Sequence, residues 1–188
     1  MHRRLITLAA VLFACSNGPS GSSNDAGAPT SDAASASSPL DDGQIVGVLH
    51  ALYEGESDEG RVVANSAARA EIVSFADQVV TDDSSADAAL TRDAASESIA
   101  PSDSPASAGL RGNTAQELAT LKSETGSALA VSFVSFAAAR ERGALAILDR
   151  LLSRYASNPQ LRARVASARE IVTDHLAHAN ALAIALAR

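Results

Sequence analysis

Residues 158–188 read NPQLRARVASAREIVTDHLAHANALAIALAR, and this stretch decides the fold. Asn158 supplies a helix N-cap, and Pro159 suits the first helical turn. Apolar residues then recur at alternating spacings of three and four, which is the period of a helix with one buried face. The residues of this seam are Leu161, Val165, Ala168, Val172, His175, Ala179, Leu182 and Leu186. The stretch therefore predicts a long amphipathic helix with a histidine on its buried face.

Three further segments carry the same period and predict helices at about 43–64, 69–95 and 127–156. Their seams are Ile45, Leu49, Leu52, Glu56, Glu59 and Val63; then Ile72, Ala76, Val79, Asp83, Ala86 and Leu90; then Val134, Ala137, Glu141, Ala144, Leu148, Leu151 and Tyr155. Turns near 66–68 and 157–159 would make two hairpins. The prediction is an all-α, antiparallel four-helix bundle with one long crossover. The alternative is a looser helical array in which the two hairpins do not share a core.

The predicted crossover runs between the two hairpins. Residues 96–113, SESIAPSDSPASAGLRGN, are rich in Ser, Pro and Gly and predict a long internal loop. A short extra helix is expected to begin at Thr114, because Thr114 and Glu117 have the spacing of a capping box. This helix would add Leu118 and Leu121 to the core.

The first 40 residues predict export and anchoring. Arg3 and Arg4 precede a short apolar run, residues 5–13, which fits a secretory signal. Residues 12–15, Leu-Phe-Ala-Cys, resemble the bacterial lipobox, which implies cleavage after Ala14 and lipid attachment to Cys15. Residues 1–14 are thus the predicted lipoprotein signal peptide, 15–40 a disordered tether of mainly small and polar residues, and 41–188 the helical domain. The alternative is an ordinary signal peptide that happens to contain a cysteine.

This anchor also predicts a location and limits the chemistry. Ser16 after the cysteine indicates the outer membrane, facing the periplasm. Removing residues 1–14 leaves 13 basic and 22 acidic side chains, a formal net charge of −9, so nucleic acid is not an expected partner. A lipidated Cys15 leaves no thiol for a disulfide or a metal. The sequence has no phosphate-binding glycine loop, no His-Glu-x-x-His and no nucleophile elbow, so no enzyme is predicted.

Each long helix nevertheless carries an ionisable residue on its apolar seam: Glu56, Asp83, Glu141 and His175. Glu141 lies 17 residues before Asn158 and His175 lies 17 after it, so an antiparallel hairpin places them at the same height. Asp83 lies about 15 residues beyond the first predicted turn and Glu56 about 11 before it. These two differ by roughly one helical turn and need not meet.

The four seam residues support two interpretations. They are candidate ligands of a metal ion, although bundles that hold two metals use Glu-x-x-His motifs, which this chain lacks, so at most one divalent ion is expected. Alternatively, Glu141 and His175 form a buried hydrogen-bonded pair that fixes helix register, or the acids lie exposed near the open end of the bundle. Asp82 is interpreted as a solvated residue, and His178 as a partly exposed histidine on the flank of the seam.

Three stretches resemble a bacterial family called domain of unknown function 4142. They are YEGESDEGRVVANSA (53–67), AEIVSFADQVVTDDSSADAAL (70–90) and NPQLRARVASAREIVTDHLAHANAL (158–182), within a similarity that spans about 42–186. The resemblance implies a ferritin-like fold and the common label of predicted outer membrane protein. The family usually has histidines at the positions of Asp83 and Glu141, and only His175 is kept here. The two acids either act as hard metal ligands or mark a lost site.

These observations favour a lipid-anchored protein of the cell envelope without enzymatic activity, acting as a helical interaction or stress-related module. Its membrane contact would be the lipid on Cys15, with no cofactor and an unknown protein partner. The alternative function is a ferritin-like metal-binding or oxidase protein. That alternative needs one divalent ion held by the carboxylates and the histidine of the seams.

Overall fold

The predicted seams form long helices that pack side by side. The computed structural model describes residues 39–66, 68–154 and 158–188; within these residues the chain forms five helices and no strand. The helices are α1 (Asp42–Ala64), α2 (Ala70–Ser96), α3 (Pro105–Ser123), α4 (Gly126–Arg154) and α5 (Pro159–Leu186). None of the helices in the described part of the chain is long and apolar enough to cross a bilayer. The all-α prediction is confirmed.

The four long helices begin and end close to their predicted bounds. Asp41 caps α1 in a capping box with Gln44, and Asn158 accepts hydrogen bonds from the backbone nitrogens of Gln160 and Leu161 at the start of α5. Several predictions lie outside the described residues: the signal peptide, the tether up to residue 38, Tyr155 and parts of both hairpin turns.

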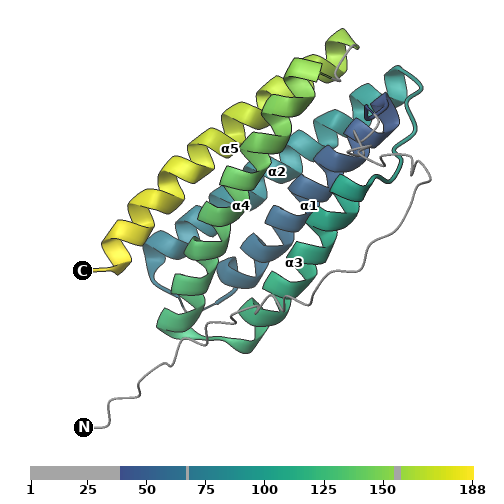
Figure 1. Ribbon diagram of the computed structural model, residues 1–188. Coiled ribbons are helices and arrows are strands. Elements are labelled where there is room, and N and C mark those ends of the chain that lie inside the picture. The colour runs from purple at the N-terminus through teal and green to yellow at the C-terminus, as the bar shows by residue number, and fades with distance from the viewer. Residues whose placement is uncertain (1–38, 67, 155–157) are drawn as a thin grey trace, which may run out of the picture. The chain divides into compact units, whose positions relative to one another are not determined.

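The two hairpins share one interior. α1 packs mainly against α2, and α4 against α5, while α2 also contacts α5 and α1 contacts α4 (Figure 1). One apolar cluster contains residues from all four helices, among them Leu49, Leu90, Leu148 and Val172. A second cluster, around Phe75 and Phe133, lies further along the same helices. The helices therefore form one bundle, and the looser array is not what the structure shows.

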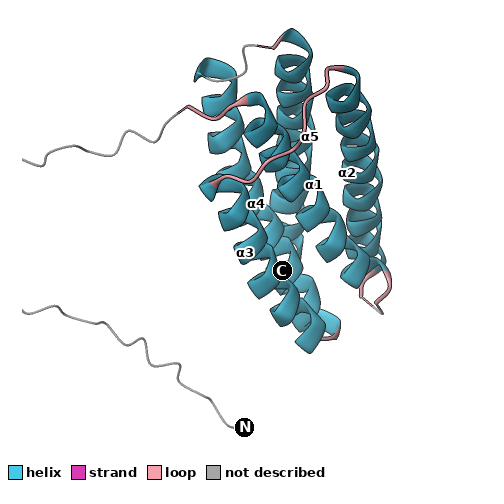
Figure 2. Cartoon of the chain, turned by 90° about the vertical axis from the view of Figure 1, so that its right-hand side faces the viewer, coloured by secondary structure: helices cyan, strands magenta, loops and turns pink. Residues whose placement is uncertain are grey.

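The connection between the hairpins differs from the prediction. Residues 96–113 are not one long loop and the extra helix does not begin at Thr114, because α3 begins at Pro105. Ser104 is its N-cap and forms a reciprocal capping box with Ser107, while Pro105 takes the first helical turn, where a missing backbone N–H costs nothing. Only Leu121 among its apolar residues is fully buried. α3 lies along α1 on the flank of the bundle (Figure 2).

Gly47 allows the 97–104 connection to lie directly on α1. The backbone nitrogen of Ser102 donates to the carbonyl of Gly43 at 3.0 Å, and a Cβ atom at Gly47 would collide with the carbonyl oxygen of Ser102. Backbone cannot rotate away as a side chain can. The absence of a side chain at this position therefore allows the connection to lie directly on α1.

We expect Gly47→Ala to lower the free energy of unfolding by about 1–3 kcal/mol, because the connection must shift to admit the methyl group. Gly112→Ala is the matched control, since nothing lies near a Cβ atom there and alanine favours a helix by up to about 1 kcal/mol. Urea denaturation followed by circular dichroism measures both. Equal stabilisation by the two substitutions would contradict the contact between Gly47 and the connection.

Candidate functional site

The four ionisable seam residues meet inside the bundle. Glu56 comes from α1, Asp83 from α2, Glu141 from α4 and His175 from α5. Their exposed fractions are 3%, 0%, 1% and 0%. They lie between the two apolar clusters, since on each helix one cluster contributes residues before them and the other contributes residues after them. The four side chains thus form a polar layer enclosed by apolar core on both sides.

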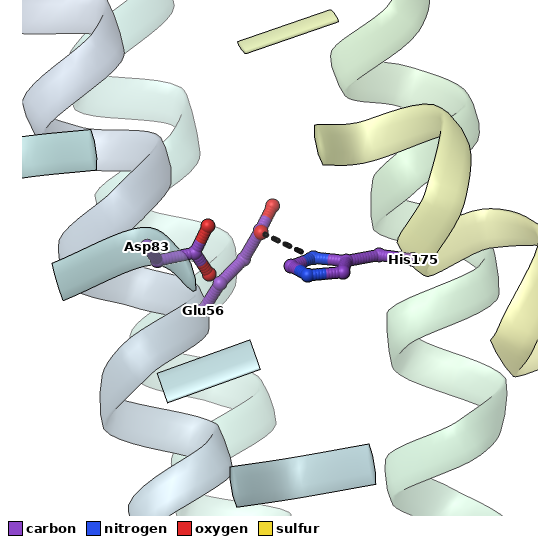
Figure 3. A group of neighbouring side chains, drawn as sticks. All are labelled: Glu56, Asp83 and His175. Carbon is purple, nitrogen blue, oxygen red and sulfur yellow. Dashed lines mark ion pairs between the residues drawn. The ribbon is translucent and has the colours of Figure 1, made fainter. Parts of the chain in front are cut away.

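His175 is the centre of this layer. Its Nδ1 atom lies 3.5 Å from Glu141 Oε1 and 3.9 Å from Glu56 Oε2. One ligand atom from each of Glu56, Asp83 and His175 lies within 4.8 Å of the other two, and Figure 3 shows the two carboxylates facing the imidazole ring. Glu141 joins this group through its contact with His175.

Residue counting predicted one of the contacts in this layer. The predicted equal height of Glu141 and His175 agrees with their 3.5 Å contact. The expectation that Glu56 and Asp83 need not meet is wrong, because both face His175. The suggestion that the seam acids lie exposed near an open end is also wrong, because all of them are buried.

The buried polar atoms of this layer have few partners. Both carboxylate oxygens of Glu56, both of Asp83, Oε2 of Glu141 and Nδ1 of His175 have no hydrogen-bond partner. Buried polar groups in native proteins are almost always hydrogen-bonded, and an unpaired one costs about 1–3 kcal/mol. Six such atoms in one buried layer are therefore a costly arrangement unless a further group binds them.

The surroundings of the layer favour the protonated forms of Glu141, Asp83 and His175. Burial, followed by repulsion from Glu56, raises the pKa of Glu141 to about 8 and the pKa of Asp83 well above its usual range, although His175 opposes both shifts. Burial by itself would lower the pKa of His175. Glu141, Glu56 and Asp83 together outweigh burial and raise the pKa of His175 to about 11.

The second ring nitrogen of His175 faces the rim of the bundle. Nε2 lies 3.2 Å from Oδ2 of Asp82, whose side chain is 40% exposed. The sequence suggested that Asp82 is a solvated residue without a role in the core. This interpretation is wrong, because Asp82 contacts His175. His178, one turn further along α5, is half-buried as expected, lies beside Gln78 and contacts the ring of Phe75 at a tilted angle.

A second buried cluster lies beside the first and was missed by the sequence reasoning. Arg140, next to Glu141 on α4, forms ion pairs with Glu59 of α1 and Glu117 of α3. The exposed fractions of the Arg140 and Glu59 side chains are 8% and 2%. The available signal was Glu59, a second acid on the α1 seam one turn after Glu56. The second acid, Glu117, could not be assigned to Arg140 without the position of α3.

A cavity of about 240 Å³ adjoins this second cluster between α1, α3 and α4. Arg140 and Glu117 contribute its polar wall, while the rest is mainly apolar, from residues such as Leu52 and Ile147. None of the four seam residues is among its lining residues. The cavity therefore does not open directly onto the layer around His175.

The donor set of that layer suits a metal ion. It offers up to three carboxylates and one imidazole nitrogen, each from a different helix. Carboxylates suit hard ions such as Mn²⁺, whereas imidazole suits Fe²⁺ and Zn²⁺. A cation would also bind the oxygens that now lack partners and would offset the negative charge that burial makes costly. The residues present therefore fit one ion of this class.

The comparisons with known proteins give the family. The family model described as Domain of unknown function (DUF4142) matches residues 26–182, which is most of the chain. The chain therefore belongs to this family, as the three sequence stretches indicated. No curated protein and no solved structure gave a match.

Proposed function

We propose that this member of the DUF4142 family is a metal-binding protein of the cell envelope. One divalent ion of the Mn²⁺, Fe²⁺ or Zn²⁺ class binds Glu56, Asp83 and His175, and Glu141 completes the set. Each of four helices supplies one ligand, and this is the sense in which we propose a ferritin-like arrangement. Of the two functions that the sequence suggests, we therefore favour metal binding over a helical interaction module.

The observation that carries the proposal is the set of six buried polar atoms without hydrogen-bond partners around His175. A purely structural Glu141–His175 pair would account for two of these side chains. It does not account for Glu56 and Asp83, because two more buried carboxyl groups add desolvation cost and mutual repulsion. A bound cation accounts for all four residues.

The donor set narrows the choice of ion. Ca²⁺ takes six to eight oxygen ligands, and Mg²⁺ usually keeps several waters, so neither suits a site of few donors between two apolar clusters. A mixed set of carboxylates and one histidine suits a first-row transition metal. The absence of a second histidine among the four seam residues supports one ion per chain.

Elemental analysis of the purified full-length protein tests this function. The protein should carry Cys15→Ser so that a free thiolate does not bind metal, and it should be incubated with Mn²⁺, Fe²⁺ or Zn²⁺ and then desalted. We expect about one retained ion per chain. At about 100 times the dissociation constant, the ion should add roughly 2.7 kcal/mol to the free energy of unfolding. No retained ion and no thermal shift with any of the three metals would contradict the proposal.

The metal-free protein should become less stable as the pH rises from 6 to 9. Glu141 keeps a proton in the fold that the unfolded chain loses near pH 4.5, so its contribution is complete below pH 4.5 and disappears as the pH rises through about 8. The contribution of His175 is complete below pH 6.5 and declines toward pH 11. Both shifts act in the same direction.

Urea denaturation with a chelator at pH 6, 7.5 and 9 measures this dependence. Glu141→Gln should reduce the slope, because one of the titrating groups is removed. Saturating Zn²⁺ should also reduce it, since the ion replaces the protons. A metal-free protein that gains stability over this range would contradict protonated acids in the layer.

The location is proposed from the sequence. The lipobox-like residues 12–15 and the small, polar stretch that follows support a protein lipidated on Cys15 and held at the outer membrane, facing the periplasm. We expect Cys15→Ser to leave the precursor uncleaved and without lipid, as measured by mass spectrometry of the membrane fraction. Normal cleavage of the Cys15→Ser precursor would instead indicate an ordinary signal peptide.

A further inference from the structure

We propose that Asp82 is a positioning residue that makes Nδ1 of His175 the metal-binding atom. This inference rests on the proposed metal site and extends it to a residue outside the ligand set. In the metal-bound state Asp82 accepts a hydrogen bond from Nε2–H, and Nδ1, which gives up its proton to the solvent, faces Glu56 and Glu141 as the ligand atom.

The two nitrogens of the ring have different surroundings. Nε2 lies 3.2 Å from Asp82 Oδ2, which is hydrogen-bond distance. Nδ1 has no hydrogen-bond partner and lies 3.5 Å and 3.9 Å from the nearest oxygens of Glu141 and Glu56. Which nitrogen of a histidine binds metal is set by the hydrogen bond that the other nitrogen makes. The geometry therefore selects Nδ1.

Asp82 and Asp83 are neighbours on α2 with different positions relative to the core. Successive helical residues point about 100° apart, so one carboxylate enters the core layer while the other stays at the rim. Asp83 is fully buried and Asp82 is 40% exposed on its side chain. The pair thus brings one acid to the ligand group and one to the outer edge of the histidine ring.

The ring is also held from a third side. Phe75, from the same helix as Asp82, meets the imidazole edge-on with ring centroids 6.2 Å apart. This contact limits the orientations available to the ring, and the hydrogen bond to Asp82 selects among them. An acid that holds the far nitrogen of a ligand histidine also increases its basicity, which strengthens the metal bond.

Zinc affinity and ring-nitrogen NMR together test the role of Asp82. The full-length Cys15→Ser protein and its Asp82→Ala, Asp82→Asn and Asp87→Asn variants are titrated with Zn²⁺ against a competing chelator. Asp87 is the matched control, because it lies on the same helix and also pairs with a histidine, His50, at 2.5 Å. We expect Asp82→Ala to weaken Zn²⁺ binding about 10–100-fold. Asp82→Asn should weaken it less, because an amide oxygen still accepts from Nε2–H, and Asp87→Asn should not change it.

The ¹⁵N shifts of the Zn²⁺-loaded protein should show His175 bound through Nδ1 and protonated on Nε2. Unchanged affinity in Asp82→Ala, or binding through Nε2 in the parent protein, would overturn this inference while leaving the metal site intact. A parent protein that binds no Zn²⁺, Mn²⁺ or Fe²⁺ would overturn the proposed function and this inference together. A merely structural role for Asp82 would lower the stability of the metal-free variant without changing its Zn²⁺ affinity.

Discussion

Replacing Arg140 by methionine should lower the free energy of unfolding by about 3–5 kcal/mol, because it leaves the buried Glu59 and the partly buried Glu117 without their cation. The Arg140 guanidinium contacts Glu59 and Glu117, and the Glu59 side chain is only 2% exposed. Burial raises the pKa of Glu59 and the guanidinium opposes this rise, so removing Arg140 makes the charged form of Glu59 still more costly. Methionine keeps most of the volume, which limits the cavity effect.

Arg169→Met is the matched control for this prediction. Arg169 also pairs with an acid, Asp149, but both side chains are about half exposed. Such surface pairs contribute about 0–1 kcal/mol, so this variant should unfold almost like the parent. Urea denaturation at pH 7.5 compares the two. A loss for Arg140→Met as small as that for Arg169→Met would contradict its role as the compensating ion.

A companion variant separates charge from packing. If the cost comes from unpaired acids, adding Glu59→Leu and Glu117→Gln to Arg140→Met should recover much of the lost stability, since apolar replacements of buried ion pairs are often neutral. If the cost came from lost packing alone, the extra substitutions would add further damage. The comparison matters for the metal site, because Arg140 and Glu141 are adjacent and the ion cluster ties α4 to α1 and α3.

The sequence predicted the long helices well because their seams are dense and regular. The height of Glu141 and His175 followed from counting residues on either side of Asn158, since both helices rise by the same distance per residue. α3 was placed too late because residues 105–113 carry almost no apolar stripe. The N-cap Ser104 and the first-turn Pro105 were the available signals, and the surrounding Ser, Gly and Pro masked them.

The meeting of Glu56 and Asp83 could not be obtained from residue counting. Counting compares Cα heights, and these differ by about one turn across the α1–α2 hairpin. Helical side chains lean toward the N-terminus of their own helix. Glu56 therefore leans away from the hairpin turn and Asp83 leans toward it, so the two carboxylates approach each other. The direction of the side chains therefore brings together two carboxylates whose Cα atoms lie at different heights.

Asp83→Asn should lower the affinity for Zn²⁺ at least about 100-fold, while the metal-free fold stays at least as stable as the parent at pH 8. The substitution keeps the size of the side chain and removes a carboxylate, and an amide oxygen is a much weaker ligand for a transition metal. The stability of the metal-free protein is not expected to fall, because the cost of burying Asp83 and its repulsion from Glu56 outweigh its attraction to His175 and raise its pKa well above the usual range. Burying a neutral amide costs less than burying a charge.

The two interpretations of the layer, a metal site and a purely structural group, predict opposite results for Asp83→Asn. If Asp83 served only as a structural counter-charge to His175, its removal would break a buried ion pair and destabilise the metal-free protein by about 3–5 kcal/mol. A metal ligand predicts the reverse: binding is lost and stability is kept. Zn²⁺ competition with a chelator measures the first quantity, and urea denaturation in excess chelator measures the second. Asp77→Asn, an exposed residue on the same helix, should change neither.

The two interpretations differ in the expected change in stability of the metal-free protein because of the position of Asp83 in the core. Burial and the neighbouring Glu56 raise its pKa well above the usual range, so the metal-free fold is strained by this carboxyl at neutral pH. Binding sites commonly lower the stability of the empty fold in this way, because their charges are offset only in the bound state. A variant that is stable and yet unable to bind Zn²⁺ would therefore identify Asp83 as a ligand. A variant that is unstable and still binds Zn²⁺ would instead support a purely structural role for the layer.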